Sequence, residues 1–240
     1  MLFRHTKSDI VGRVIVRAVS ELLAVVVPPA CAACRMPLTR ADLRLCAGCT
    51  RALPWLPARL CRRCGLPSHR RGCPAAGAAF ARAWAPLAYD GVARELVAAL
   101  KFRGALPAAA LMAAHVAANL PADVRDGPWA ALVPVPPHRG RRRRRGFDPA
   151  AELTAGLASR LGLPARPCLR RRDRESQLGA TRAQRRRAGR LSIELRAPPP
   201  ARALLIDDVH TTGATLDACA CALRAGGCRE VVAITYARTL

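Results

Sequence analysis

The sequence predicts an α/β fold in which helices flank a parallel sheet, with a small cysteine-rich element in front of it. Two short, uninterrupted apolar runs, 130–135 and 203–206, have the length and composition of strands that are buried on both faces. A segment of helical character follows each run, which is the alternation that builds a parallel sheet. Most of the 11 cysteines lie between Cys31 and Cys73. A chain of 240 residues can hold one such domain and a small appendage.

The amino-terminal segment 1–30 is expected to form an amphipathic helix, because its charged residues recur at helical spacing among apolar ones. A signal peptide is the alternative for the apolar run 14–27. Arg17 and Glu21 interrupt that run, which argues against both a signal peptide and a stable membrane span. The many paired cysteines, if they are reduced and bind metal, indicate a cytoplasmic protein.

The next segment, 31–78, carries paired cysteines at the spacing of zinc ligands. Two Cys-x2-Cys pairs separated by eleven residues are typical of a tetrahedral zinc ribbon, and their members are Cys31, Cys34, Cys46 and Cys49. Disulfides in an exported protein are the alternative, although Cys-x2-Cys pairs seldom form a secreted framework. A second, less regular set could bind a second zinc ion, and it consists of Cys61, Cys64, Cys73 and His69. The other cysteines, in apolar contexts, are expected to be buried: Cys168, Cys219, Cys221 and Cys228.

The remaining residues, 79–240, are expected to form the α/β domain. Periodicity and turn residues predict strands at 83–89, 130–135, 166–169, 191–195, 203–206 and 230–237, and helices at 92–100, 106–120, 150–161 and 216–225. Asp148 and Pro149 have the residue types of an N-cap and a first helical position. Gly226 and Gly227 are expected to end the last helix.

The segment 203–215 contains the strongest functional motif. Asp207 and Asp208 are expected at the carboxyl end of the strand 203–206, where open α/β sheets bind ligands. Paired carboxylates there can accept hydrogen bonds from two neighbouring ribose hydroxyls. The turn that follows offers hydroxyls and backbone N–H groups to a phosphate, and it consists of Thr211, Thr212, Gly213, Ala214 and Thr215. An ordinary turn capped by Asp208 and Thr211 is the alternative.

The charge balance favours polyanionic ligands. The chain has 40 Lys and Arg against 16 Asp and Glu, a net charge of +24. Arginines cluster at 139–145, 170–174 and 182–190, where they are either solvated surface or a binding site for single-stranded nucleic acid. Aromatic residues make up only 4%, which gives little support to a base-stacking platform.

Together these motifs resemble the ComF family, phosphoribosyltransferase-like proteins linked to DNA uptake in competent bacteria. The resemblance is carried by the amino-terminal helix and cysteine pairs, Lys101-Phe102-Arg103-Gly104, Val133-Pro134-Val135-Pro136, Arg145-Gly146-Phe147, Gln177 and the segment 207–215. That last segment resembles the phosphoribosyl-pyrophosphate signature of type I phosphoribosyltransferases. Two positions depart from the family pattern, Ala76 in place of a cysteine and Asp148 in place of an asparagine.

The resemblance implies a type I phosphoribosyltransferase-like fold that binds 5-phosphoribosyl 1-pyrophosphate together with Mg²⁺. Asp207 and Asp208 would bind the ribose, and the turn 211–215 its 5-phosphate. The pyrophosphate would face a group of cationic residues, namely His138, Arg139, Arg145, Lys101 and Arg103. Single-stranded DNA and a DNA-uptake helicase are the implied macromolecular partners. Three functions stay open: an active phosphoribosyltransferase of nucleotide metabolism, a ligand-binding module without turnover, and a nucleic-acid-binding factor. No catalytic residue can be named.

Overall fold

The computed structural model describes residues 29–40, 42–69, 72–138, 140, 143, 145–171 and 192–240. The chain divides into two compact units, Met1–Ala52 and Leu53–Leu240. The expected amino-terminal helix at 1–30 falls almost entirely outside the described residues. The described part of the first unit contains a single short helix, α2 (Ala47–Arg51), which follows a loop that carries the first cysteine pair.

The second unit is built on a five-stranded sheet in which every pairing is parallel. Four strands lie side by side in the order β1 (Arg82–Trp84), β7 (Glu230–Arg238), β6 (Arg202–His210) and β3 (Ala131–Pro134), and β2 (Leu87–Ala88) also pairs with β7. An isolated parallel bridge between Leu132 and Ala165 continues the sheet beyond β3. The predicted parallel sheet is thus confirmed.

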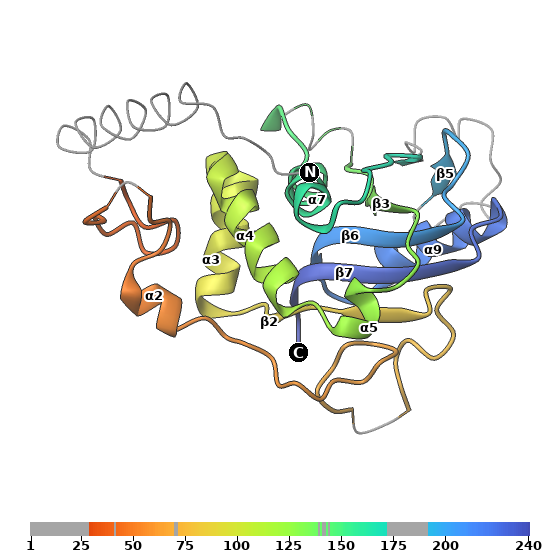
Figure 1. Ribbon diagram of the computed structural model, residues 1–240, viewed down its shortest axis with the longest axis horizontal. Coiled ribbons are helices and arrows are strands. Elements are labelled where there is room, and N and C mark those ends of the chain that lie inside the picture. The colour runs from red at the N-terminus through yellow and green to blue at the C-terminus, as the bar shows by residue number, and fades with distance from the viewer. Residues whose placement is uncertain are drawn as a thin grey trace, which may run out of the picture. The chain divides into compact units, whose positions relative to one another are not determined.

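Helices cover both faces of this sheet (Figure 1). The helices are α3 (Gly91–Arg103), α4 (Leu106–Asn119), α5 (Ala122–Arg125), α7 (Pro149–Leu161) and α9 (Ala214–Ala225). The connections through α3, α4 and α7 cross the sheet in one direction, whereas the connection through α9 runs from β6 to β7 in the opposite direction. Because such crossovers are right-handed, α9 lies on the face opposite to the other three long helices. No helix in the described residues has the length and apolarity needed to cross a bilayer.

The strand β6 is longer than the sequence predicts. Its apolar half, 203–206, is buried as expected, but the strand continues through both aspartates to His210. The cause is the neighbouring strand β7, whose backbone goes on pairing with β6, with Asp207 opposite Thr235 and His210 opposite Arg238. The aspartates therefore lie within the last part of the strand and not beyond its end.

Other local predictions are confirmed with small shifts. Asp148 is the N-cap of α7, and its Oδ1 accepts a hydrogen bond of 3.1 Å from the backbone N–H of Ala150. The expected strand at 83–89 is divided into β1 and β2 around Pro86, which has no N–H for the ladder. The two weaker strands form an antiparallel pair, β4 (Leu169–Arg171) and β5 (Ile193–Leu195). One prediction is wrong: Cys221 is exposed, because it lies on the solvent side of α9.

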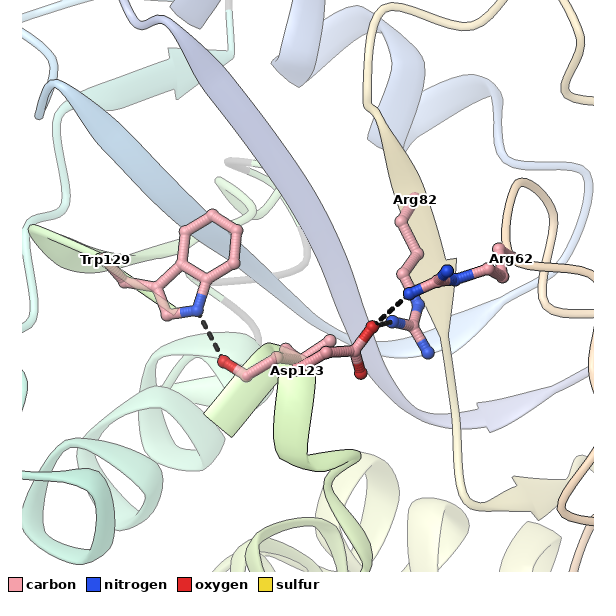
Figure 2. A network of polar contacts seen from close by, with 5 residues as sticks. Arg62, Arg82, Asp123 and Trp129 are labelled. Atoms are coloured by element: carbon pink, nitrogen blue, oxygen red, sulfur yellow. Dashed lines mark hydrogen bonds and ion pairs between the residues drawn. The ribbon is translucent and has the colours of Figure 1, made fainter. Parts of the chain in front are cut away.

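An ion-pair network connects the segment that carries the second set of cysteines, 61–73, to the sheet (Figure 2). Asp123 of α5 accepts hydrogen bonds at Oδ2 from Arg62 and, at 2.7 Å, from Arg82 of β1. Next to Asp123 in the chain, the carbonyl of Val124 accepts a hydrogen bond of 2.5 Å from Trp129 Nε1. The Arg62 side chain is 78% exposed, so its ion pair contributes less than about 1 kcal/mol.

Candidate functional site

The first cysteine cluster has the dimensions of a zinc site. The four sulfur atoms lie within 4.8 Å of one another, and they belong to Cys31, Cys34, Cys46 and Cys49. The Sγ atoms of Cys34 and Cys46 are 3.8 Å apart. Four sulfurs bound tetrahedrally to zinc at about 2.3 Å are separated by about 3.8 Å, so the cluster is close to the dimensions that the ion requires. All four cysteines are free thiols, which argues against the disulfide alternative.

Backbone N–H groups favour the thiolate form of Cys31 in this cluster. Cys46 is the N-cap of α2, where its Sγ accepts from the N–H of Cys49 at 3.4 Å, and its own N–H donates to Cys31 Sγ at 3.4 Å. Burial opposes ionisation of Cys31, but the N–H groups of Cys46 and Cys34 hold the pKa of its thiol at about 6. A thiolate is the form that binds zinc.

The second cluster lies in the second unit and includes the histidine that the sequence suggested. The ligand atoms of Cys61, Cys64, His69 and Cys73 also lie within 4.8 Å of one another, with the sulfurs of Cys61 and Cys73 3.9 Å apart. The backbone N–H of Cys64 and the side chain of His69 lower the pKa of Cys61 to about 6. Three thiols and an imidazole form a complete ligand set for a second zinc ion, despite Ala76.

Arg63 connects this second cluster to the loop that follows it, and sequence reasoning missed it because nothing distinguishes it from the many other arginines. Its guanidinium donates to five backbone carbonyls, those of Ala75 (3.0 Å), Ala76 (3.2 Å), Ala78 (2.5 Å), Phe80 (2.7 Å) and Ala81 (3.0 Å). Farther along, the backbone N–H of Ala79 donates to Asp217 Oδ1 of α9 at 2.7 Å. The loop 75–81 is therefore held between the metal cluster and α9.

The aspartates of β6 have different surroundings. Asp208 is 6% exposed, and its Oδ1 accepts a hydrogen bond of 2.7 Å from Lys101 Nζ at the end of α3. Asp207 Oδ1 accepts from the backbone N–H of Asp208 at 2.9 Å. Burial, and then the negative charge of Asp208, raise the pKa of Asp207 to about 8, and the charge of Lys101 only partly offsets this. At neutral pH Asp207 is therefore mostly protonated, so it can donate as well as accept a hydrogen bond.

The turn 211–215 leaves the start of α9 open. The N-cap of α9 is Gly213, with φ of 83°, which has no side chain to cap the helix, and Thr212 Oγ1 accepts a long hydrogen bond of 3.4 Å from the N–H of Ala214. Gly213, and not Asp208 or Thr211, therefore takes the N-cap position of α9. A Cβ at Gly213 would lie 2.8 Å from His210 Nε2, so only glycine fits there. Thr211, Thr212 and Ala214 are exposed, so the turn lies at the surface, where the N–H groups of a helix start can meet an anion.

Arg238, at the end of β7, fixes the base of this turn. It is 5% exposed and donates from Nη1 to the carbonyls of His210, at 3.0 Å, and Thr211. Burial, reinforced by the positive charge of Arg238, lowers the pKa of His210 to about 4, so the imidazole is neutral at pH 7. A cavity of about 220 Å³ lies beside the turn, and its walls include Cys64, Phe80, Gly213 and Arg238.

The structure brings together only some of the cationic residues that the sequence analysis expects around a pyrophosphate. Lys101 contacts Asp208, and the Arg145 guanidinium lies 5.1 Å from the ring centroid of Phe102, beside Lys101 in the chain. Arg103 instead turns back along α3, where its Nη2 donates to the carbonyl of Glu95 at 3.2 Å. His138 is exposed, and Arg139 lies outside the described residues.

The raised pKa of Asp207 predicts a pH-dependent stability. The folded state keeps a proton that the unfolded state, with a pKa near 3.8, releases. Stability should therefore fall as the pH rises from about 5 to about 8, and Asp207→Asn should remove that dependence. Over this pH range, we expect the free energy of unfolding of the wild-type protein to fall by at least about 1 kcal/mol more than that of the variant, as measured by urea unfolding at each pH. Parallel stability profiles for the two proteins would contradict the assignment.

Comparison with known proteins adds one finding. Residues 22–81 match the family described as double zinc ribbon domain, a span that contains both cysteine clusters. A search of the curated proteins gives no match. The amino-terminal region is therefore a zinc ribbon, and the sequence-based prediction of a zinc-binding element ahead of an α/β domain is confirmed.

Proposed function

We propose that this chain is a phosphoribosyltransferase-like protein that binds 5-phosphoribosyl 1-pyrophosphate. The observation that carries the proposal is the start of α9, where the N-cap Gly213 has no side chain to cap the helix and which follows the two aspartates in the last part of β6 by one short turn. An anion at the helix start and hydroxyl partners at the carboxylates are the two recognition elements of a ribose 5-phosphate. The accessible Thr211 and Thr212 add hydroxyl donors for the phosphate.

The arrangement of Lys101 suggests how the pyrophosphate is received. The ion pair with Asp208 holds the ammonium group of Lys101 beside the proposed ribose site, within reach of a pyrophosphate on the same sugar. Mg²⁺ would neutralise charge on the leaving pyrophosphate, and a carboxylate oxygen such as that of Asp208 is a ligand of the kind it prefers. Transfer of the ribosyl group would then depend mainly on positioning and electrostatics.

The cellular role belongs to the same proposal. Membership of the ComF family, a type I phosphoribosyltransferase fold and a cytoplasmic role in DNA uptake are supported by the motifs that carry the resemblance. The net charge of +24 favours single-stranded DNA as a further ligand. An enzyme would release pyrophosphate in the presence of an acceptor, whereas a binding module would bind the ligand without turnover.

The double variant Asp207→Asn, Asp208→Asn tests the ribose site. The loss of the Asp208 carboxylate and of the Asp207 carboxyl group should weaken binding of 5-phosphoribosyl 1-pyrophosphate by at least about 100-fold, because both would hydrogen-bond the ribose and the bonds to the charged Asp208 contribute most. Calorimetry with and without Mg²⁺ measures the change, and Asp126→Asn, which alters an exposed acid at the end of α5, is the control. Unchanged affinity in a folded double variant would refute the proposed site.

A further inference from the structure

Two motifs far apart in the sequence lie against each other beside the aspartates. The Arg145 guanidinium covers the ring of Phe102 at 5.1 Å, and a Cβ on Gly104 would lie 4.0 Å from the ring of Phe147. Phe102 directly follows Lys101, whose ammonium group is bound to Asp208. The end of α3 and the segment 145–148 therefore form one surface next to the candidate ribose site.

Phe102 is not held in place by burial in the core. Its side chain is 71% exposed, more than any other large hydrophobic residue in the described part of the chain. Arg145 lies over the ring, yet this degree of exposure leaves most of the ring accessible to a ligand. The Nε of Arg145 is buried and has no hydrogen-bond acceptor among the described residues, and the ring of Phe102 is a contact that the structure gives this guanidinium.

We propose that Phe102, backed by Arg145, is a stacking platform for a nucleobase. An accessible aromatic ring binds the π-face of any base, and a cation on its other side adds to the attraction. A sugar phosphate bound at Asp208 and the turn 211–215 would carry its base next to this ring. The proposal rests on the proposed function, because the proposed sugar-phosphate site determines where the base would lie. It assigns the acceptor of the ribosyl group to the class of nucleobases. The base comes either from a free nucleotide or from single-stranded DNA.

The nucleotide arm of the test compares two ligands that differ only in the base, ribose 5-phosphate and adenosine 5′-monophosphate. Wild-type protein should bind the nucleotide about 5- to 140-fold more tightly, the range expected for stacking of one base. Phe102→Ser should abolish that preference and leave the affinity for ribose 5-phosphate unchanged, whereas Phe102→Trp should keep it. Leu106→Ser, at a position that is 46% exposed at the start of α4, is the matched control.

The DNA arm uses an oligothymidylate and an abasic oligomer of equal length, with the same variants. If the wild-type protein prefers the probe with a base in either pair, and Phe102→Ser abolishes that preference, the result supports the platform. The pair that shows the preference identifies the source of the base. No preference in wild type with both pairs, or a preference that survives Phe102→Ser, overturns it. Failure of ribose 5-phosphate and of 5-phosphoribosyl 1-pyrophosphate to bind would refute the proposed function alone, and the oligonucleotides would then decide the platform.

Discussion

Cys46→Ser is expected to release the zinc ion of the first cluster and to unfold the metal-binding part of the first unit. That part has little else to stabilise it: α2 has no buried residue, and the buried apolar side chains are few, with Leu38 and Leu45 the largest. Structural zinc contributes about 10–16 kcal/mol in zinc-finger peptides, far more than such a core can supply. Serine keeps an oxygen that can cap α2, so the change isolates the lost thiolate.

Metal analysis and limited proteolysis measure this effect. Wild-type protein should contain two zinc ions and Cys46→Ser one, with rapid cleavage confined to the first unit. Cys221→Ser, which alters an exposed cysteine of α9 outside both clusters, should retain both ions. His69→Ala should weaken only the second site. Wild-type protein without zinc under reducing conditions would refute both metal sites.

Much of the architecture could be predicted because it depends on local pattern. The apolar run 203–206 needed only its length and composition to be identified as a buried strand, and Asp148 followed by Pro149 was enough to place the start of α7. The first zinc cluster followed from spacing alone. His69 could be suggested as a fourth ligand of the second cluster, and the structure brings it to the three cysteines.

The rest depends on partners that are distant in the chain. The extension of β6 to His210 is imposed by β7, and no residue of β6 signals it. The ion pair of Lys101 with Asp208 and the contact of Arg145 with Phe102 both require α3 to end beside β6. A low aromatic content argues against an extended stacking surface, but it cannot say where a single exposed ring lies.

Arg63→Ala should destabilise the second unit more than any other arginine substitution we can name. Five carbonyls of the loop 75–81 receive hydrogen bonds from this one guanidinium, and they lie outside the strands and helices that would otherwise satisfy them. We expect the free energy of unfolding, measured in urea with zinc present, to fall by about 3 kcal/mol. Arg63→Lys should rescue little of it, because one ammonium group cannot span the same carbonyls.

The neighbouring Arg62 supplies the matched control for this effect. It lies in the same cysteine pair, and its exposed ion pair with Asp123 predicts a loss below about 1 kcal/mol in Arg62→Ala. The loop 75–81 also lines the cavity beside the turn 211–215, so Arg63→Ala should weaken the second zinc site and phosphate binding together, while Arg62→Ala affects neither. If the two variants lose equal stability, Arg63 does not organise this loop, and the link between the second metal cluster and the anion site fails with it.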